Sequence, residues 1–299
     1  MSDVAHFDPE PAALQKYVPV EPYGLLESHA KGEVIPLSIQ INLFDCGGIA
    51  IGVCISHKIA DIESLVMFIN AWATTCRHGS MQASIHPCFD LTSRFPPLDP
   101  STFSSKPQPP RSEDIGKFIR KRFVFDKEVL SKLKKVGSST QVTNPTRIEA
   151  VTAFLWRNFM IAFGQDDKRG RKKINFSACH AVNVRSKASP PLAAHSFGNG
   201  TVPATARSTK PESKDEQESY AVLVTKLRNA IRASTTITLS RCKMEITMNV
   251  WSVRGGLWMG QAGLVSTIGV PFKNVTVFMD TRCGDGIEAW VSMVEKTWL

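Results

Sequence analysis

A histidine and an aspartate four residues apart are the side chains in this sequence best suited to chemistry. His57 and Asp61 stand in "SHKIAD" (56–61), directly after the apolar run "GGIAIGVCI" (47–55). A neutral imidazole at the end of a strand can take a proton near neutral pH, for example from an alcohol or amine that attacks an acyl carbonyl. The alternative is a structural histidine whose ring nitrogens bond nearby backbone, and position alone does not separate the two interpretations.

Asp61 also has more than one interpretation. An aspartate just before a helical stripe is a natural N-cap, whereas a direct pair with His57 is geometrically possible although the chain turns between them. The spacing would suit two metal ligands, but no third ligand stands nearby, so we expect no metal. The sequence has no G-x-S-x-G, G-x-x-x-x-G-K-[ST] or strand-linked G-x-G-x-x-G motif. Direct transfer between two bound substrates is therefore favoured over a covalent acyl-enzyme.

The segments around these two residues predict a hairpin followed by a helix. Residues 36–44 alternate apolar and polar side chains, "DCGG" (45–48) supplies a turn, and a second alternating run begins at Ile49. In that run the large residues, which His57 continues, share one face, and small residues share the other. A buried helix is predicted to begin close after Asp61, with its apolar stripe at Ile62, Leu65, Val66, Ile69, Ala73 and Cys76.

The remaining chain predicts an α/β fold in two domains. Residues 93–112 are rich in proline and serine and lack periodicity, which is typical of a linker. Strands and helices interleave after it. They are a strand at 121–125, a helix capped by Asp126 and ended by Gly137, a helix with Thr146 and Glu149 at capping-box spacing, a strand at 174–185, a helix from Tyr220 and a late strand at 270–280.

Composition excludes several classes of protein. Of 299 residues 42% are hydrophobic and 21% charged, which is a globular composition, and no apolar run is long enough to span a membrane. No secretory signal is visible, and seven cysteines without a C-x-x-C pair predict reduced thiols in a cytoplasmic protein. The net charge of +9 gathers in two short runs, 120–122 and 168–173, without a nucleic-acid-binding motif. We therefore predict surface segments and no nucleic-acid partner, and a basic nucleic-acid binder is the last of the alternatives.

Beyond these patterns, "SHKIAD" with its flanks resembles the catalytic segment of the plant BAHD (HXXXD-type) acyl-CoA-dependent acyltransferases, most of all their vinorine synthase-like branch. The resemblance covers most of the chain in order. It continues through "FDLTSRFPPLD" (89–99), "KRFVFDKEVLSKLK" (121–134), "TRIEAVTAFLWR" (146–157), "AVNVRSKASPPL" (181–192), "FGNG" (197–200) and "PFKNVTVFMDTRCGDGIEAWV" (271–291).

The resemblance implies a two-domain, chloramphenicol-acetyltransferase-like architecture with mixed sheets and flanking helices. It places an incomplete first domain at 1–95, a crossover loop at 96–113 and a second domain at 114–299. It implies that His57 is the general base and that Asp61 is a structural partner of Arg185. The implied co-substrates are an acyl-CoA, with acetyl-CoA expected, and an alcohol from plant specialised metabolism, bound by a cytoplasmic monomer without a resident cofactor.

Two departures from the family pattern keep an alternative open. Where relatives carry D-F-G-W-G, this chain has Gly256, Leu257, Trp258, Met259 and Gly260, so only the last glycine matches in place. Relatives also have a substantial segment before the point where this chain begins. The alternative is a truncated, catalytically inactive relative or a non-enzymatic binding protein.

Overall fold

The computed structural model describes residues 14–20, 35–79, 86–95, 118–164, 175–209, 219–234, 246–252, 274–281 and 283–294. The chain divides into two compact units. The first unit comprises Met1–Pro110, Ser189–Gly200 and Gly255–Pro271, and the second comprises Arg111–Ala188, Thr201–Arg254 and Phe272–Leu299. Two units were predicted as continuous blocks, whereas two segments from late in the chain cluster with the first unit.

Some predicted features lie outside the described residues. These are the whole crossover loop (96–113), the basic run at 168–173 and the altered pentapeptide with Gly256, Trp258 and Gly260. Among the helices that the structure describes, none combines the length and apolarity needed to cross a bilayer.

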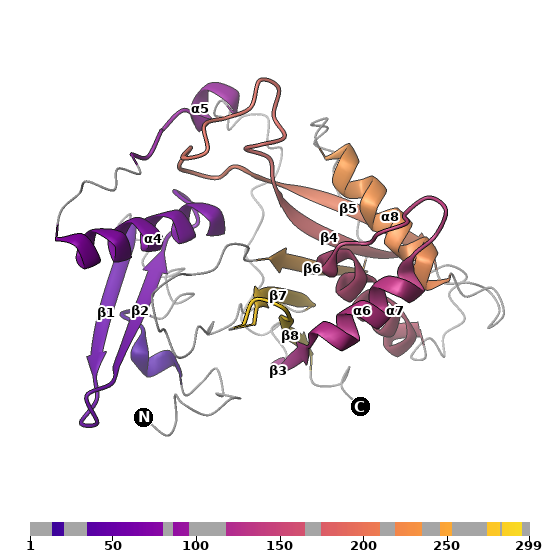
Figure 1. Ribbon diagram of the computed structural model, residues 1–299, viewed down its shortest axis with the longest axis horizontal. Helices are drawn as coiled ribbons and strands as arrows, with labels where there is room; N and C mark the ends of the chain where they lie inside the picture. Colours follow the sequence, from indigo (N-terminus) through magenta and orange to yellow (C-terminus); the bar gives the residue numbers. More distant parts are fainter. Residues whose placement is uncertain are drawn as a thin grey trace, which may run out of the picture. The chain divides into compact units, whose positions relative to one another are not determined.

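The first unit contains the predicted hairpin, formed by β1 (Leu37–Leu43) and β2 (Ile49–Ile55) in antiparallel register. Helix α4 (Ile62–His78) follows it and crosses the two strands, and the short elements η1 (Gln15–Tyr17) and α5 (Leu91–Arg94) also belong to this unit (Figure 1).

The two faces of the hairpin have opposite surroundings. The small-residue face is covered by η1 and Val18, so closely that a Cβ at Gly52 would lie 2.1 Å from the carbonyl oxygen of Tyr17. Asn42 secures this contact by donating from Nδ2 to the same oxygen at 3.0 Å. The large apolar face is exposed at Ile39, Ile41, Leu43, Ile49 and Ile51.

The second unit is built on a six-stranded mixed sheet with the order β3-β8-β7-β6-β4-β5. Its parallel pairs are β4–β6 and β6–β7, and the other neighbours are antiparallel. The strands are β3 (Phe118–Phe125), β4 (Asn175–Asn183), β5 (Thr201–Thr209), β6 (Ile246–Ser252), β7 (Val275–Asp280) and β8 (Ile287–Val294).

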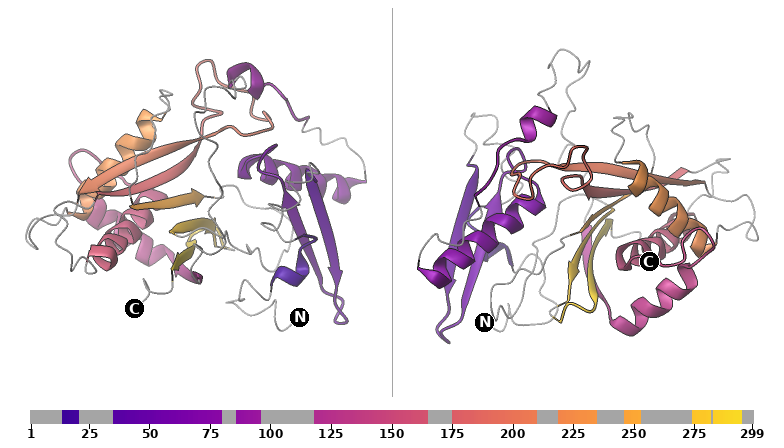
Figure 2. Two further views of the ribbon diagram at one scale, coloured as in Figure 1. Left: turned by 180° about the vertical axis from the view of Figure 1, so that it is seen from behind. Right: turned by 45° about the horizontal axis from the view of Figure 1, so that its top comes forward.

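Helices α6 (Lys127–Gly137), α7 (Arg147–Gly164) and α8 (Tyr220–Ala233) lie on one face of this sheet (Figure 2). Between helices and sheet, aromatic side chains form the centre of the core, including the fully buried Trp156, Phe159, Phe176 and Phe278. Burial of such large apolar side chains is the main term that stabilises this unit. The mixed α/β class predicted from sequence is confirmed.

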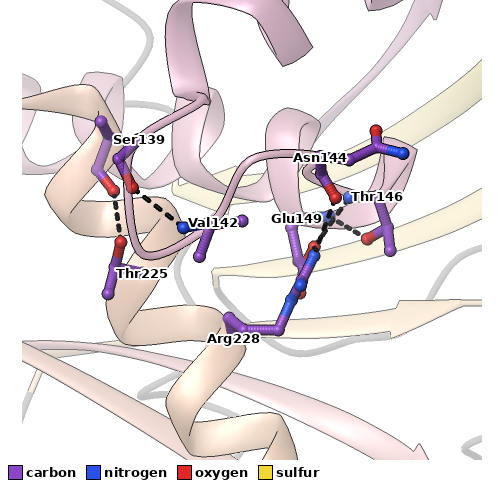
Figure 3. A network of polar contacts seen from close by, with 8 residues as sticks. Ser139, Val142, Asn144, Thr146, Glu149, Thr225 and Arg228 are labelled. Carbon is purple, nitrogen blue, oxygen red and sulfur yellow. Dashed lines mark hydrogen bonds and ion pairs between the residues drawn. The ribbon is translucent and has the colours of Figure 1, made fainter.

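The predicted helix caps are also confirmed. Asp126 accepts from the Val129 amide at 2.8 Å, and Thr146 and Glu149 form the reciprocal capping box at the start of α7. Arg228 of α8 forms a two-pronged ion pair with Glu149, so the same carboxylate caps α7 and joins it to α8 (Figure 3).

Candidate active site around His57

His57 lies in the turn between β2 and α4. Pairing of the hairpin extends one residue past β2, where the Ser56 amide donates to the Pro36 carbonyl at 2.9 Å. The chain then turns, because the Ile59 amide donates to the Ser56 carbonyl at 3.0 Å, and the His57 side chain is exposed. The prediction that His57 continues the apolar face of the strand is therefore wrong. Strand β2 ends at Ile55, and the turn places His57 between the strand and α4.

Asp61 is buried, with 3% of its surface exposed, and is the N-cap of α4. Its Oδ1 accepts from the Ser64 amide at 3.0 Å, which satisfies a backbone donor of the first helical turn. Its Oδ2 accepts from the Gly200 amide at 2.9 Å. Both oxygens of the carboxylate thus bind backbone amides, and the N-cap interpretation of Asp61 is confirmed.

Arg185 follows β4 and is buried, with 3% of its surface exposed. Its backbone amide and its Nη1 both donate to Oδ1 of Asn183, at 3.0 and 3.2 Å. Arg185 belongs to the second unit and Asp61 to the first, so their pairing stays a prediction.

Asn199 is a site residue that reasoning from the sequence missed. Its Nδ2 donates to the backbone carbonyl of His57 at 2.8 Å, which turns its Oδ1 toward the ring, 3.1 Å from His57 Nδ1. An amide oxygen only accepts hydrogen bonds, so this contact requires the proton on Nδ1. The neutral ring then carries its basic lone pair on Nε2.

The segment that carries Asn199 is attached to the first turn of α4. Gly198 adopts φ 134°, a conformation that favours glycine, and a Cβ there would lie 2.9 Å from Leu91 Cδ1. The hydroxyl of Ser64 donates to the Gly198 carbonyl at 2.8 Å and accepts from the Gly198 amide at 3.0 Å. Asp61 contributes its own amide, which donates to the same carbonyl at 3.2 Å.

A second short segment supports this one from the other side. The Cys88 amide donates to the His195 carbonyl at 2.9 Å, and the Phe197 amide donates to the Cys88 carbonyl at 2.7 Å. The rings of Phe89 and Phe197 meet edge to face with centroids 5.8 Å apart. Residues 195–200 are therefore bonded both to the start of α4 and to the segment at Cys88.

The described residues offer little support for other site chemistry. Burial raises the pKa of the Cys54 thiol on β2, which disfavours the thiolate that a nucleophile would need. Within the described ranges, His, Cys, Asp and Glu side chains form no cluster able to hold a metal ion. An exposed imidazole held by Asn199 at Nδ1 is suited to proton transfer at Nε2.

Comparisons with known proteins agree with the resemblance found in the sequence. The model of the "Transferase family" matches residues 1–277. Stemmadenine O-acetyltransferase of Catharanthus roseus is 36% identical over 94% of this chain and 68% of its own length. Vinorine synthase of Rauvolfia serpentina is 33% identical over the same shares of the two chains.

Solved structures extend the likeness to the fold. The crystal structure of vinorine synthase superposes with a TM-score of 0.73 at 32% identity, over 97% of this chain and 69% of that one. F. sporotrichioides TRI101, complexed with coenzyme A and T-2, has a TM-score of 0.63 at 16% identity over 88% of this chain and 66% of that one. The second likeness concerns the fold alone.

Proposed function

We propose that this chain, which belongs to the BAHD family of acyltransferases, transfers an acyl group from an acyl-CoA to a hydroxyl group of a plant specialised metabolite. Acyl transfer is the enzyme class of its relatives. The names stemmadenine O-acetyltransferase and salutaridinol 7-O-acetyltransferase support an acetyl donor, for which we propose acetyl-CoA, and a hydroxyl group as acceptor.

In the proposed reaction His57 is the general base. Nε2 takes the proton of the acceptor hydroxyl while its oxygen attacks the thioester carbonyl carbon. The tetrahedral intermediate collapses with cleavage of the carbon–sulfur bond, and the departing CoA sulfur receives the proton from Nε2. The base is thereby restored, and no covalent enzyme intermediate is needed.

The observation that carries this role is the contact between His57 and Asn199. The 3.1 Å contact at Nδ1 commits that nitrogen to the proton and leaves the lone pair on the opposite nitrogen. A general base needs a defined tautomer as well as a suitable position, and the Asn199 contact supports the tautomer with the proton on Nδ1.

The test is the release of CoA thiol from acetyl-CoA by the purified chain with a panel of alcohols. We expect His57→Ala to lower the rate by about 10²–10⁴-fold, the usual contribution of general base catalysis. His78→Ala is the matched control, because His78 is exposed in the last turn of α4, and it should retain the wild-type rate. Equal rates for His57→Ala and wild type would refute the mechanism.

The alternative is a folded binding protein without turnover, and it is motivated by the altered pentapeptide at 256–260. It predicts cooperative unfolding and calorimetric binding of CoA, but no thiol release with any acceptor. The cytoplasmic location and the monomeric state remain predictions from the sequence.

A further inference from the structure

We propose that Ser64 is a positioning residue for His57, because its hydroxyl holds the segment that places Asn199 against the imidazole. The kinetic consequence rests on the proposed function. The effect on the ring itself does not, because the tautomer of His57 can be measured without turnover.

Ser64 is fully buried, and its hydroxyl serves a segment 134 residues away in the sequence. Oγ donates to the Gly198 carbonyl at 2.8 Å and accepts from the Gly198 amide at 3.0 Å. One hydroxyl thus satisfies both backbone groups of a residue, as a neighbouring strand would do.

The two glycines beside Asn199 are therefore both attached to the start of α4. Gly198 is attached through Ser64, and Gly200 through the Asp61 carboxylate at 2.9 Å. Asn199 stands between these anchors, and its amide makes both contacts with His57.

Anchoring matters because Asn199 and His57 are both exposed. Water competes for the hydrogen bonds of exposed side chains, so such a pair persists only when its two backbones are held at the right separation. His57 is fixed by the turn after β2, and Ser64 holds the Asn199 segment together with Asp61, whose amide and carboxylate bond Gly198 and Gly200. Without the Ser64 hydroxyl, we expect the amide oxygen of Asn199 to leave Nδ1 for part of the time, so that the ring populates both neutral tautomers.

The experiment is ¹⁵N NMR of the full chain labelled at its histidines, recorded above the protonation range of histidine. Ring nitrogens that carry hydrogen and those that do not have well-separated shifts, and the spectrum of His57→Gln assigns the His57 signals. Wild type should show the Nδ1–H form. Ser64→Ala should show averaged shifts at His57 alone, as should Asn199→Ala.

Ser64→Thr, which retains the hydroxyl, should keep the wild-type spectrum. Ser93→Ala is the matched control, because the Ser93 hydroxyl is exposed and donates to the nearby Asp90 carbonyl at 2.6 Å, within its own short helix. Should Ser64→Ala fail to fold, Ser64→Cys offers a similar shape with weaker hydrogen bonding.

An unchanged Nδ1–H spectrum in folded Ser64→Ala or Ser64→Cys would overturn the proposal. In thiol-release assays the positioning role predicts a roughly 3- to 10-fold lower kcat with little change in KM, because only part of the population holds the wrong tautomer. If the tautomer shifts while wild type shows no turnover with any acceptor, the positioning role stands and the proposed acyl transfer fails.

Discussion

Replacing Arg228 by methionine would leave the Glu149 carboxylate buried without its cation. The side chain of Glu149 is 4% exposed and that of Arg228 19% exposed, and two guanidinium nitrogens bind the two carboxylate oxygens (Figure 3). Breaking a buried ion pair by removing one partner costs about 3–5 kcal/mol. Glu149 would keep the Thr146 amide at 2.7 Å, so we expect a loss near the lower end, about 3 kcal/mol.

The size of this loss should depend on pH. Burial alone would raise the pKa of Glu149, but hydrogen bonds from Arg228 and Thr146 outweigh it and lower the pKa below its ordinary value of 4.5. A carboxylate with a lowered pKa stabilises the folded state above pH 4.5, and this stabilisation is lost as the pH falls through the folded-state pKa. Without Arg228 the pKa rises, so the two proteins should converge in stability at acid pH.

Urea unfolding of the whole chain at about pH 7 and at about pH 3, followed by circular dichroism and by tryptophan fluorescence, measures both effects and tests for a single transition. Arg232→Met is the control, because Arg232 is exposed in the last turn of the same helix and should cost at most about 1 kcal/mol. If Arg228→Met and Arg232→Met lose equal stability at neutral pH, or the Arg228→Met loss does not shrink in acid, the reasoning is refuted.

Three further substitutions test packing and titration. Gly52→Ala places a Cβ 2.1 Å from the Tyr17 carbonyl oxygen, and the displaced backbone should cost about 1–3 kcal/mol in urea unfolding. Gly137→Ala places a Cβ 2.9 Å from the Tyr220 ring. We expect a net loss of stability of about 1 kcal/mol, because this clash costs more than the higher helix propensity of alanine contributes. A higher urea midpoint than that of wild type would contradict this expectation. Burial raises the pKa of Tyr220, whose hydroxyl donates to the Ala150 carbonyl at 2.5 Å. The contribution of the protonated hydroxyl to the stability of the folded state is therefore complete below pH 10, and it is lost as the pH rises further. Between about pH 9 and about pH 11, the stability of Tyr220→Phe should therefore fall less than that of wild type. Equal losses would show that titration of Tyr220 does not cause the fall in wild type.

The sequence predicted those elements whose pattern is local. Period-two alternation located β1 and β2, and a capping residue ahead of an apolar stripe located α4, α6 and α7. Strand β5 was missed because its inward residues are small, at Ala204 and Ala206, and because Pro203 interrupts it. It lies at the edge of the sheet, where the missing amide of a proline is tolerated.

The candidate site likewise contains residues that a local sequence pattern predicts and a residue that no local pattern predicts. His57 and Asp61 could be singled out because both stand in one short motif, and Asp61 proved to be a cap as its place before the helix predicted. Asn199 could not be identified as the partner of a histidine 142 residues away, since such a contact depends on how distant segments pack. The glycines on either side of Asn199 were the available signal, because two glycines flanking one polar residue indicate a backbone with special requirements.

The exposure of His57 changes how its role must be understood. A base shielded by Ile55 and the rest of the apolar face would depend on burial for its behaviour, whereas this ring stands in a turn outside the strand. What the fold supplies instead is orientation. A capping aspartate and a buried serine in one helical turn bond the glycines beside an asparagine, and in our proposal this asparagine determines which ring nitrogen carries the proton. A substitution in that helical turn should therefore affect proton transfer without contacting either substrate.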